Sequence, residues 1–146
     1  MRSRIGWRTG RTLRRVSVTE AVKVLLVEDE EAVAEMYRLR LVADGYVVVI
    51  AADGEAGLRA AFEEDPAFIF LDLRLPKLSG MELLSRLRGN PATRDIPVIV
   101  LTNMTEPELS YRGTSLGIVE YMIKAETTPM QLSMRLAEHQ RRMEAT

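Results

Sequence analysis

The sequence predicts one α/β domain in which a parallel sheet carries helices on both faces. From residue 21 onward, five short apolar runs alternate with stretches of helical periodicity. Strands that alternate with helices form parallel sheets, because each helix returns the chain to the same edge. At 146 residues and 47% hydrophobic, the chain also has the size of one domain with a sizeable core.

The elements are expected in strict strand–helix order. The strands are apolar runs at residues 22–27, 46–51, 67–71, 96–101 and 119–123. The helices are expected at 30–44, 54–64, 81–88, 108–116 and from an N-cap at 128 to about 143. Gly45 ends the first helix, and Thr128 with Gln131 forms a capping box at the start of the last.

The first twenty residues differ in composition from the rest. They hold six arginines against Glu20, a net charge of +5, so a whole-chain charge of −1 leaves −6 for the remainder. Such a tail can contact nucleic acid, membrane or protein, or act as a targeting segment. A solvated, disordered extension is the preferred interpretation. The predicted organisation is a basic extension at 1–20 and a folded domain at 21–146.

Composition excludes several classes of site. The chain has no cysteine, which excludes disulfides and thiolate metal sites and fits an expected cytoplasmic location. No apolar stretch approaches the roughly 20 residues of a membrane helix. His139, the only histidine, lies in a charged stretch without a partner for catalysis, and is expected at the surface.

Polar residues follow four of the five predicted strands. They are Glu28 and Asp29 after the first strand, Asp72 after the third, Thr102 and Asn103 after the fourth, and Lys124 after the fifth. In open parallel sheets, ligands bind outside the carboxyl ends of the strands. We therefore expect the functional site at this edge.

The residue types at this edge favour phosphoryl chemistry. Three carboxylates in a partly desolvated pocket need a counter-charge, and oxygen ligands suit Mg²⁺. A carboxylate can also attack phosphorus to form an aspartyl phosphate. The phosphoryl group then needs a cation and a hydroxyl donor, which Lys124 and Thr102 offer. Asp72 is therefore the expected acceptor.

Each of these residues also has an ordinary structural role. Asp72 alone is typical of a turn or a helix cap, and Lys124 alone is typical of a surface lysine. Glu28 and Asp29 could simply complement the dipole of the first helix. Their joint placement at strand ends favours the functional interpretation.

Together with Pro76, Gly80 and Tyr121, this set resembles the receiver domain of two-component response regulators in motif, order and spacing. The resemblance covers about residues 21–143 and points to a stand-alone receiver. It implies a flavodoxin-like (βα)5 fold, with a doubly wound parallel sheet in strand order 2-1-3-4-5. Pro76 and Gly80 would shape the loop after the third strand and start the third helix.

The resemblance also implies a role for each site residue. Asp72 would be the phosphoacceptor. The implied metal is Mg²⁺, held by Glu28, Asp29, Asp72 and the backbone carbonyl of Arg74. The implied phosphoryl-binding groups are Thr102, Lys124 and the backbone of Asn103, and the implied switch residues are Thr102 and Tyr121.

The implied function is a phosphorylation switch. A histidine kinase or histidine phosphotransfer protein would phosphorylate Asp72, after which Thr102 would move toward the phosphoryl group and Tyr121 would turn inward. This would reshape a face made by the fourth helix, fifth strand and fifth helix, which binds an unknown effector protein. Catalysis would be limited to Asp72 itself, so no enzyme acting on a free substrate is expected. The acidic body argues against direct DNA contact.

Three positions stand out against the family pattern. Ala125 stands where the family usually has proline after the lysine, which leaves the conformation of that peptide bond open. Asn103 stands where the family usually has a small residue. Arg74 lies two residues past the phosphoacceptor. We expect Arg74 and Asn103 to tune the lifetime of the phosphorylated state.

Alternative functions stay open. The chain could be the receiver of a longer regulator whose effector domain is missing, or a pseudo-receiver that signals without phosphate, as the absent proline allows. A haloacid-dehalogenase-type phosphatase needs a second aspartate two residues after the nucleophile, where this chain has Arg74. The sequence also has no glycine-rich phosphate loop, which argues against nucleotide hydrolysis.

Overall fold

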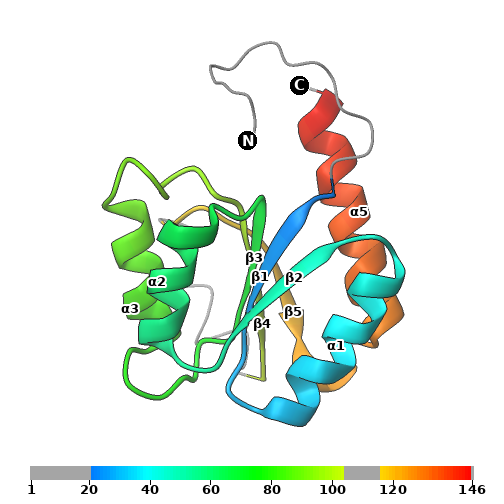
Figure 1. The fold of residues 1–146 in the computed structure, drawn as a ribbon, viewed down its shortest axis with the longest axis horizontal. Coiled ribbons are helices and arrows are strands. Elements are labelled where there is room, and N and C mark those ends of the chain that lie inside the picture. Colours follow the sequence, from blue (N-terminus) through cyan, green and yellow to red (C-terminus); the bar gives the residue numbers. More distant parts are fainter. Residues whose placement is uncertain (1–20, 104–115, 146) are drawn as a thin grey trace.

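The computed structural model describes residues 21–103 and 116–145, and these form a parallel sheet between two layers of helices (Figure 1). The strands are β1 (Lys23–Val27), β2 (Val47–Ala51), β3 (Phe68–Leu71), β4 (Val98–Thr102) and β5 (Ile118–Ile123). The helices are α1 (Glu31–Ala43), α2 (Gly54–Glu64), α3 (Gly80–Arg88) and α5 (Pro129–Ala145), with the 3-10 turn η3 (Lys124–Glu126) after β5.

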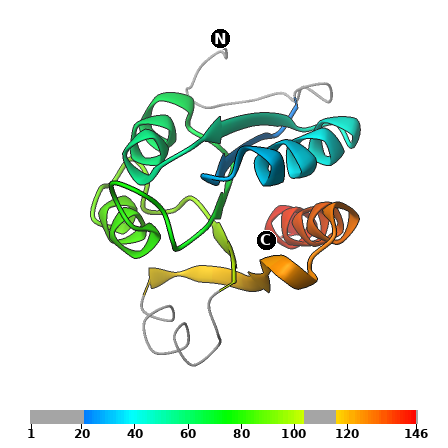
Figure 2. The same cartoon turned by 90° about the horizontal axis from the view of Figure 1, so that it is seen from below.

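The strand order is β2-β1-β3-β4-β5, and every pairing is parallel. This confirms the predicted flavodoxin-like order 2-1-3-4-5. The connections place α1 and α5 on one face of the sheet and α2 and α3 on the other, as seen in two perpendicular views (Figures 1 and 2). Within the described residues, no helix combines the length and apolar character needed to span a membrane.

Two hydrophobic cores lie on opposite faces of the sheet, because successive side chains of a strand point to opposite faces. Val24 and Leu26 of β1 pack in the core under α1 and α5, whereas Leu25 and Val27 pack in the core under α2 and α3. All four residues of the central strand β3 are buried. The apolar run before Asp72 is therefore explained by burial on both faces.

The predicted ends of the described strands and helices lie within two residues of the observed ends, and the start of β4 shows the largest difference among the strands. This strand was expected at 96–101 and runs from Val98 to Thr102. Ile96 belongs to the preceding turn, because its N–H donates to the Thr93 carbonyl at 3.2 Å. The turn η3 was not predicted. The helix expected at 108–116 and the extension at 1–20 lie almost wholly outside the described residues.

Local side-chain caps set the helix ends. Asp53 accepts the Ala56 N–H at 2.8 Å and starts α2, which ends at Asp65 in the left-handed conformation with φ 46°. At α5, Thr128 Oγ1 accepts the Gln131 N–H at 3.1 Å and Gln131 Oε1 accepts the Thr128 N–H at 2.8 Å. The predicted capping box is confirmed.

A partly buried polar cluster joins α5 to β5, and it corrects the expectation for His139. This side chain is buried, and its Nε2 lies 2.6 Å from Glu120 Oε1. Arg135 Nε also donates to Glu120, at 2.9 and 3.1 Å. Burial alone would raise the pKa of Glu120, but the hydrogen bonds from Arg135 and His139 outweigh it and lower that pKa. The surface location expected for His139 was wrong.

Gly80 allows the start of α3 to pack against the chain that leaves β3. A Cβ at this position would lie 2.5 Å from the Asp72 carbonyl oxygen and 2.5 Å from the Leu73 Cα. The Gly80 N–H donates to the Leu73 carbonyl at 3.0 Å. This glycine therefore has the structural role that the sequence predicted.

Replacing Gly80 should strain the backbone beside Asp72. We expect Gly80→Ala to lower the free energy of unfolding by about 1–3 kcal/mol, because neither backbone atom can move aside freely. Gly89→Ala is the matched control, since its Cβ would approach nothing closer than the Ser85 carbonyl at 3.5 Å. Urea unfolding of both variants measures the difference, and equal stabilities would contradict the packing argument.

Neutralising Glu120 should destabilise the domain in a pH-dependent way. Because its folded pKa lies below the ordinary value of 4.5, the carboxylate contributes stability above that value and loses it as pH falls through the lowered pKa. We expect Glu120→Gln to lower the free energy of unfolding by about 1–3 kcal/mol at pH 7. The difference in this free energy between wild type and the variant should become smaller in acid.

Glu82→Gln is the control for this experiment. Glu82 pairs with Arg86 on the same helix, and its side chain is 54% exposed. Exposed pairs of this kind contribute little. Chemical unfolding between pH 7 and pH 3 gives the comparison, and a gap that stays constant over this range would refute the role of the Glu120 charge.

Candidate functional site

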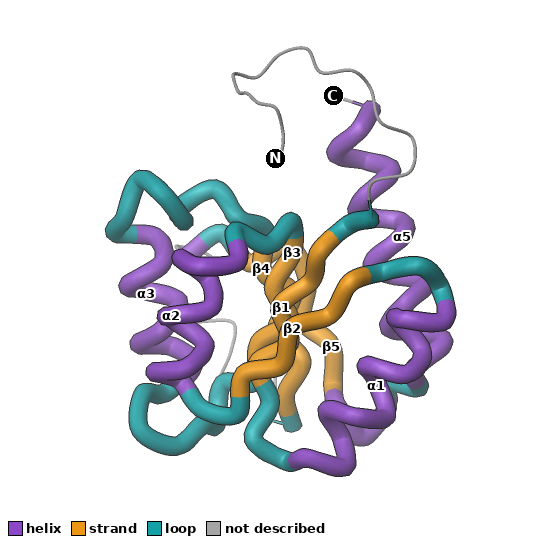
Figure 3. The backbone as a smooth tube through the Cα atoms, viewed as in Figure 1, coloured by secondary structure: helices purple, strands orange, loops and turns teal. Residues whose placement is uncertain are grey.

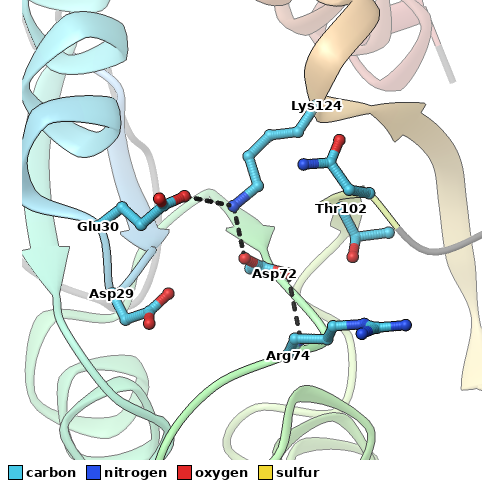
Figure 4. A pocket seen from close by; sticks show the side chains of 7 residues that line it. Asp29, Glu30, Asp72, Arg74, Thr102 and Lys124 are labelled. Atoms are coloured by element: carbon cyan, nitrogen blue, oxygen red, sulfur yellow. Dashed lines mark hydrogen bonds and ion pairs between the residues drawn. The ribbon is translucent and has the colours of Figure 1, made fainter.

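The loops that leave the carboxyl ends of the strands meet at one edge of the sheet (Figure 3). A cleft at this edge is lined by Asp29, Glu30, Asp72, Arg74, Thr102, Asn103 and Lys124. Figure 4 shows side chains from these separate loops facing the same space. The parallel sheet therefore brings together the residues that the sequence placed at its strand ends.

Lys124 is the positive centre of the cleft. Its Nζ lies 2.7 Å from Asp72 Oδ2 and 2.9 Å from Glu28 Oε1. The Lys124 side chain is 9% exposed, so the alternative of a surface lysine does not apply. Burial alone would lower the pKa of Lys124, but the hydrogen bonds and charges of the two carboxylates hold it well above its ordinary value.

Three carboxylates gather beside this lysine in the described part of the chain. Glu28, Asp29 and Asp72 each offer an oxygen, and these oxygens all lie within 4.8 Å of one another. Glu28 and Asp72 are buried, whereas Asp29 is exposed. An oxygen-only set with one solvent-facing member fits a hard cation such as Mg²⁺, which retains several waters.

Backbone hydrogen bonds orient the two buried carboxylates. Glu28 Oε2 accepts the Glu30 N–H at 3.0 Å, and Asp72 Oδ1 accepts the Arg74 N–H at 3.1 Å. Burial raises the pKa of Glu28, although hydrogen bonds from Lys124 and the Glu30 N–H oppose the shift. Each carboxylate thus has one oxygen bound to backbone and the other bound to Lys124.

Thr102 and Tyr121 lie on the β4–β5 side of the site. Thr102 is fully buried at the end of β4 and lines the cleft. Tyr121 of β5 is partly buried and packs against the core under α2 and α3. Its hydroxyl is buried and has no hydrogen-bond partner among the residues that the structure describes.

Sequence reasoning missed two contributors to the site. Glu30 was assigned to the start of a helix, yet its Oε1 lies 3.5 Å from Lys124 Nζ. Tyr37 lies within the predicted helix at 30–44 and was given no role in the site, but its hydroxyl donates to the Thr127 carbonyl at 2.8 Å, just past Lys124. The acidic run that begins at Glu28 was a usable signal for Glu30. Nothing local indicated Tyr37, because its partner is 90 residues away.

Comparison with known proteins gives the family. Residues 24–136 match the response regulator receiver domain, which is more than half of the chain. The chain belongs to the response regulator receiver family. The family and fold predicted from the sequence are thereby confirmed.

One curated relative and two solved structures are examples of proteins similar to this receiver. The alkaline phosphatase synthesis transcriptional regulatory protein PhoP of Bacillus subtilis is 36% identical over 122 residues, 84% of this chain and 50% of PhoP. A CheY-like receiver from Methanospirillum hungatei is 25% identical with a TM-score of 0.79, covering 86% of this chain and 98% of that one. The receiver of sensor histidine kinase PA1611 from Pseudomonas aeruginosa is 27% identical with a TM-score of 0.73, covering 82% and 97%.

One of these relatives holds a metal, and the curated ones extend beyond the match. The structure of the PA1611 receiver has a magnesium ion coordinated in its active-site cleft. The present chain spans about half the length of the curated relatives that it matches.

Removing the lysine charge should destabilise the receiver. We expect Lys124→Met to cost about 3–5 kcal/mol of unfolding free energy in metal-free buffer, because Glu28 and Asp72 would stay buried without a counter-charge. Lys77→Met is the matched control, since Lys77 is 62% exposed and 3.7 Å from Asp53. Its expected cost is within about 0.5 kcal/mol. Similar losses from the two variants in chemical denaturation would contradict the assigned role of Lys124.

Proposed function

We propose that this receiver accepts a phosphoryl group on Asp72 from a histidine kinase or a histidine phosphotransfer protein. One observation carries the proposal. The buried Asp72 carboxylate lies 2.7 Å from Lys124 Nζ and shares an acidic cluster with Glu28 and Asp29. A nucleophile, a cation and a set of metal donors are therefore present in one cleft.

Mg²⁺ is the proposed cofactor. Glu28, Asp29 and Asp72 would hold it, with the backbone carbonyl of Arg74 as a further oxygen donor. The short separations among the carboxylate oxygens and the magnesium in the related PA1611 receiver support this assignment. When bound, the ion would supply positive charge beside the phosphoryl oxygens.

The transfer forms one bond and breaks another at phosphorus. An Asp72 oxygen would attack in line and form an O–P bond as the P–N bond to the donor histidine breaks, its electron pair returning to the imidazole. Lys124 would donate to a phosphoryl oxygen, and so would the Thr102 hydroxyl and the Asn103 backbone. Hydrolysis would break the Asp72 O–P bond and release inorganic phosphate. This chemistry acts on the protein's own aspartate, so we do not propose turnover of a free substrate.

Phosphorylation would favour one of two conformations that already exist. In the proposed switch, Thr102 moves toward the phosphoryl group and the Tyr121 ring turns inward. The affected face contains β5 and α5, which the Glu120–Arg135 pair joins. The helix expected at 108–116 would complete this face. An effector protein would bind there, with Arg74 and Asn103 tuning how long the phosphate persists. We place this signalling in the cytoplasm and propose no direct DNA contact by these residues.

A second candidate is the receiver of a longer regulator. The match covers half of PhoP of Bacillus subtilis, which is a transcriptional regulatory protein. In that case the switch would control an output domain encoded beyond residue 146. Sequencing the encoding locus past this residue separates the two candidates, since an open reading frame that continues would favour the longer regulator.

Phosphorylation of Asp72 is tested by intact mass after incubation with acetyl phosphate and Mg²⁺. We expect one added phosphoryl group on wild type, none when Mg²⁺ is chelated before the incubation, and none on Asp72→Asn. Asp53→Asn is the matched control, because Asp53 caps α2 and asparagine caps helices equally well. This variant should be phosphorylated like wild type.

A folded wild type that takes no phosphoryl group, from acetyl phosphate or from a cognate kinase, would refute the proposal and indicate a pseudo-receiver. A phosphoryl adduct that still forms on Asp72→Asn would show that another residue is the acceptor.

A further inference from the structure

The strand that precedes Lys124 is paired on one side only. In the described sheet, β5 lies at the edge and pairs with β4. The last pair in register is Thr102 with Ile123. Lys124 follows immediately, so its backbone lies one residue past the end of the ladder. Its position must therefore depend on contacts other than strand pairing.

The Asn103 side chain makes such a contact. Its Oδ1 accepts the Ala125 N–H at 2.8 Å. Asn103 follows Thr102 just as Lys124 follows Ile123, so this side-chain amide acts as the next acceptor along the β4–β5 pair. Asn103 also lines the cleft. The hydrogen bond thus continues the strand pairing past the lysine with a side chain in place of a carbonyl.

Two further hydrogen bonds hold the other side of the same turn. Thr127 Oγ1 donates to the Ile123 carbonyl at 2.7 Å and closes the turn around Lys124. Tyr37, which is 1% exposed, donates to the Thr127 carbonyl at 2.8 Å and fixes the turn to α1. The turn is therefore held between α1 and β4, with Asn103 providing the contact to β4.

We propose that Asn103 is a positioning residue for Lys124. It holds the turn in the place from which Lys124 Nζ reaches Asp72 at 2.7 Å and Glu28 at 2.9 Å. This inference rests on the proposed function, since its consequence is the rate at which Asp72 is phosphorylated. The long, flexible stem of a lysine can compensate for part of a backbone shift, so the effect is moderate.

The proposal also connects two of the three positions that stand out against the receiver pattern, Asn103 and Ala125. Proline has no N–H, so the hydrogen bond requires another residue at 125. A small side chain at 103 could not reach that N–H. Asn103 and Ala125 therefore act as one pair, with an acceptor on β4 and a donor on the turn.

The rate of phosphorylation by acetyl phosphate tests the pair. Asn103→Leu keeps the size of the side chain and removes the acceptor. We expect it to slow phosphorylation about 3- to 10-fold, the factor that corresponds to one neutral hydrogen bond. In an Ala125→Pro background, which lacks the donor, the same substitution should cause no further change. In an Ala125→Gly background, which keeps the N–H, the slowing should persist.

Two outcomes would overturn the inference while the proposed function stands. The first is a wild-type rate in Asn103→Leu. The second is equal slowing by Asn103→Leu in the Ala125→Pro and wild-type backgrounds, because Asn103 would then act through something other than the Ala125 N–H.

A stability cycle without any phosphoryl donor keeps the two proposals separate. Asn103→Leu should lower the Tm of wild type more than the Tm of Lys124→Met. In Lys124→Met, the hydrogen bond between Asn103 and Ala125 no longer positions a lysine for an ion pair. If wild type takes no phosphoryl group, the proposed function fails, and this stability cycle alone then tests whether Asn103 positions Lys124. Coupling between positions 103 and 124 would support positioning, and equal Tm losses in the two backgrounds would refute it.

Discussion

The balance of charge at the carboxyl edge of the sheet is the constraint on which the site depends. Glu28 and Asp72 are buried carboxylates, and a buried charge without a partner is costly. The Lys124 ammonium group forms ion pairs with both carboxylates. The ammonium group must therefore stay within hydrogen-bonding distance of carboxylates at the ends of β1 and β3, although Lys124 itself follows a third strand, β5.

The architecture meets this constraint by supporting the lysine from neighbouring elements. Tyr37 of α1 and Asn103 after β4 each bind the turn that follows β5. The site thus consists of loops that carry the reactive and charged side chains and of other side chains that hold those loops in place. Asp72, Thr102 and Lys124 line the cleft, and the side chains of Tyr37 and Asn103 support the turn that begins at Lys124.

Charge pairing also organises the surface that β5 and α5 share. Glu120 binds both Arg135 and the buried His139, which joins the edge strand to the last helix. An edge strand has strand pairing on one side only, so a side-chain cluster on its face adds rigidity where the sheet is least supported. This surface is part of the proposed output face. Its internal contacts would therefore couple a movement of β5 to a movement of α5.

The sequence by itself determined the sheet order, through the receiver resemblance, and the identity of the residues that line the cleft, except Glu30. This was possible because backbone periodicity and helix caps are local, and because parallel strands all end at one edge. The pairings of side chains were decided by the tertiary structure. His139 and Glu120 are 19 residues apart, Asn103 and Ala125 are 22 apart, and Tyr37 and Thr127 are 90 apart. No local pattern encodes such distances, since they depend on which elements the folded sheet brings side by side.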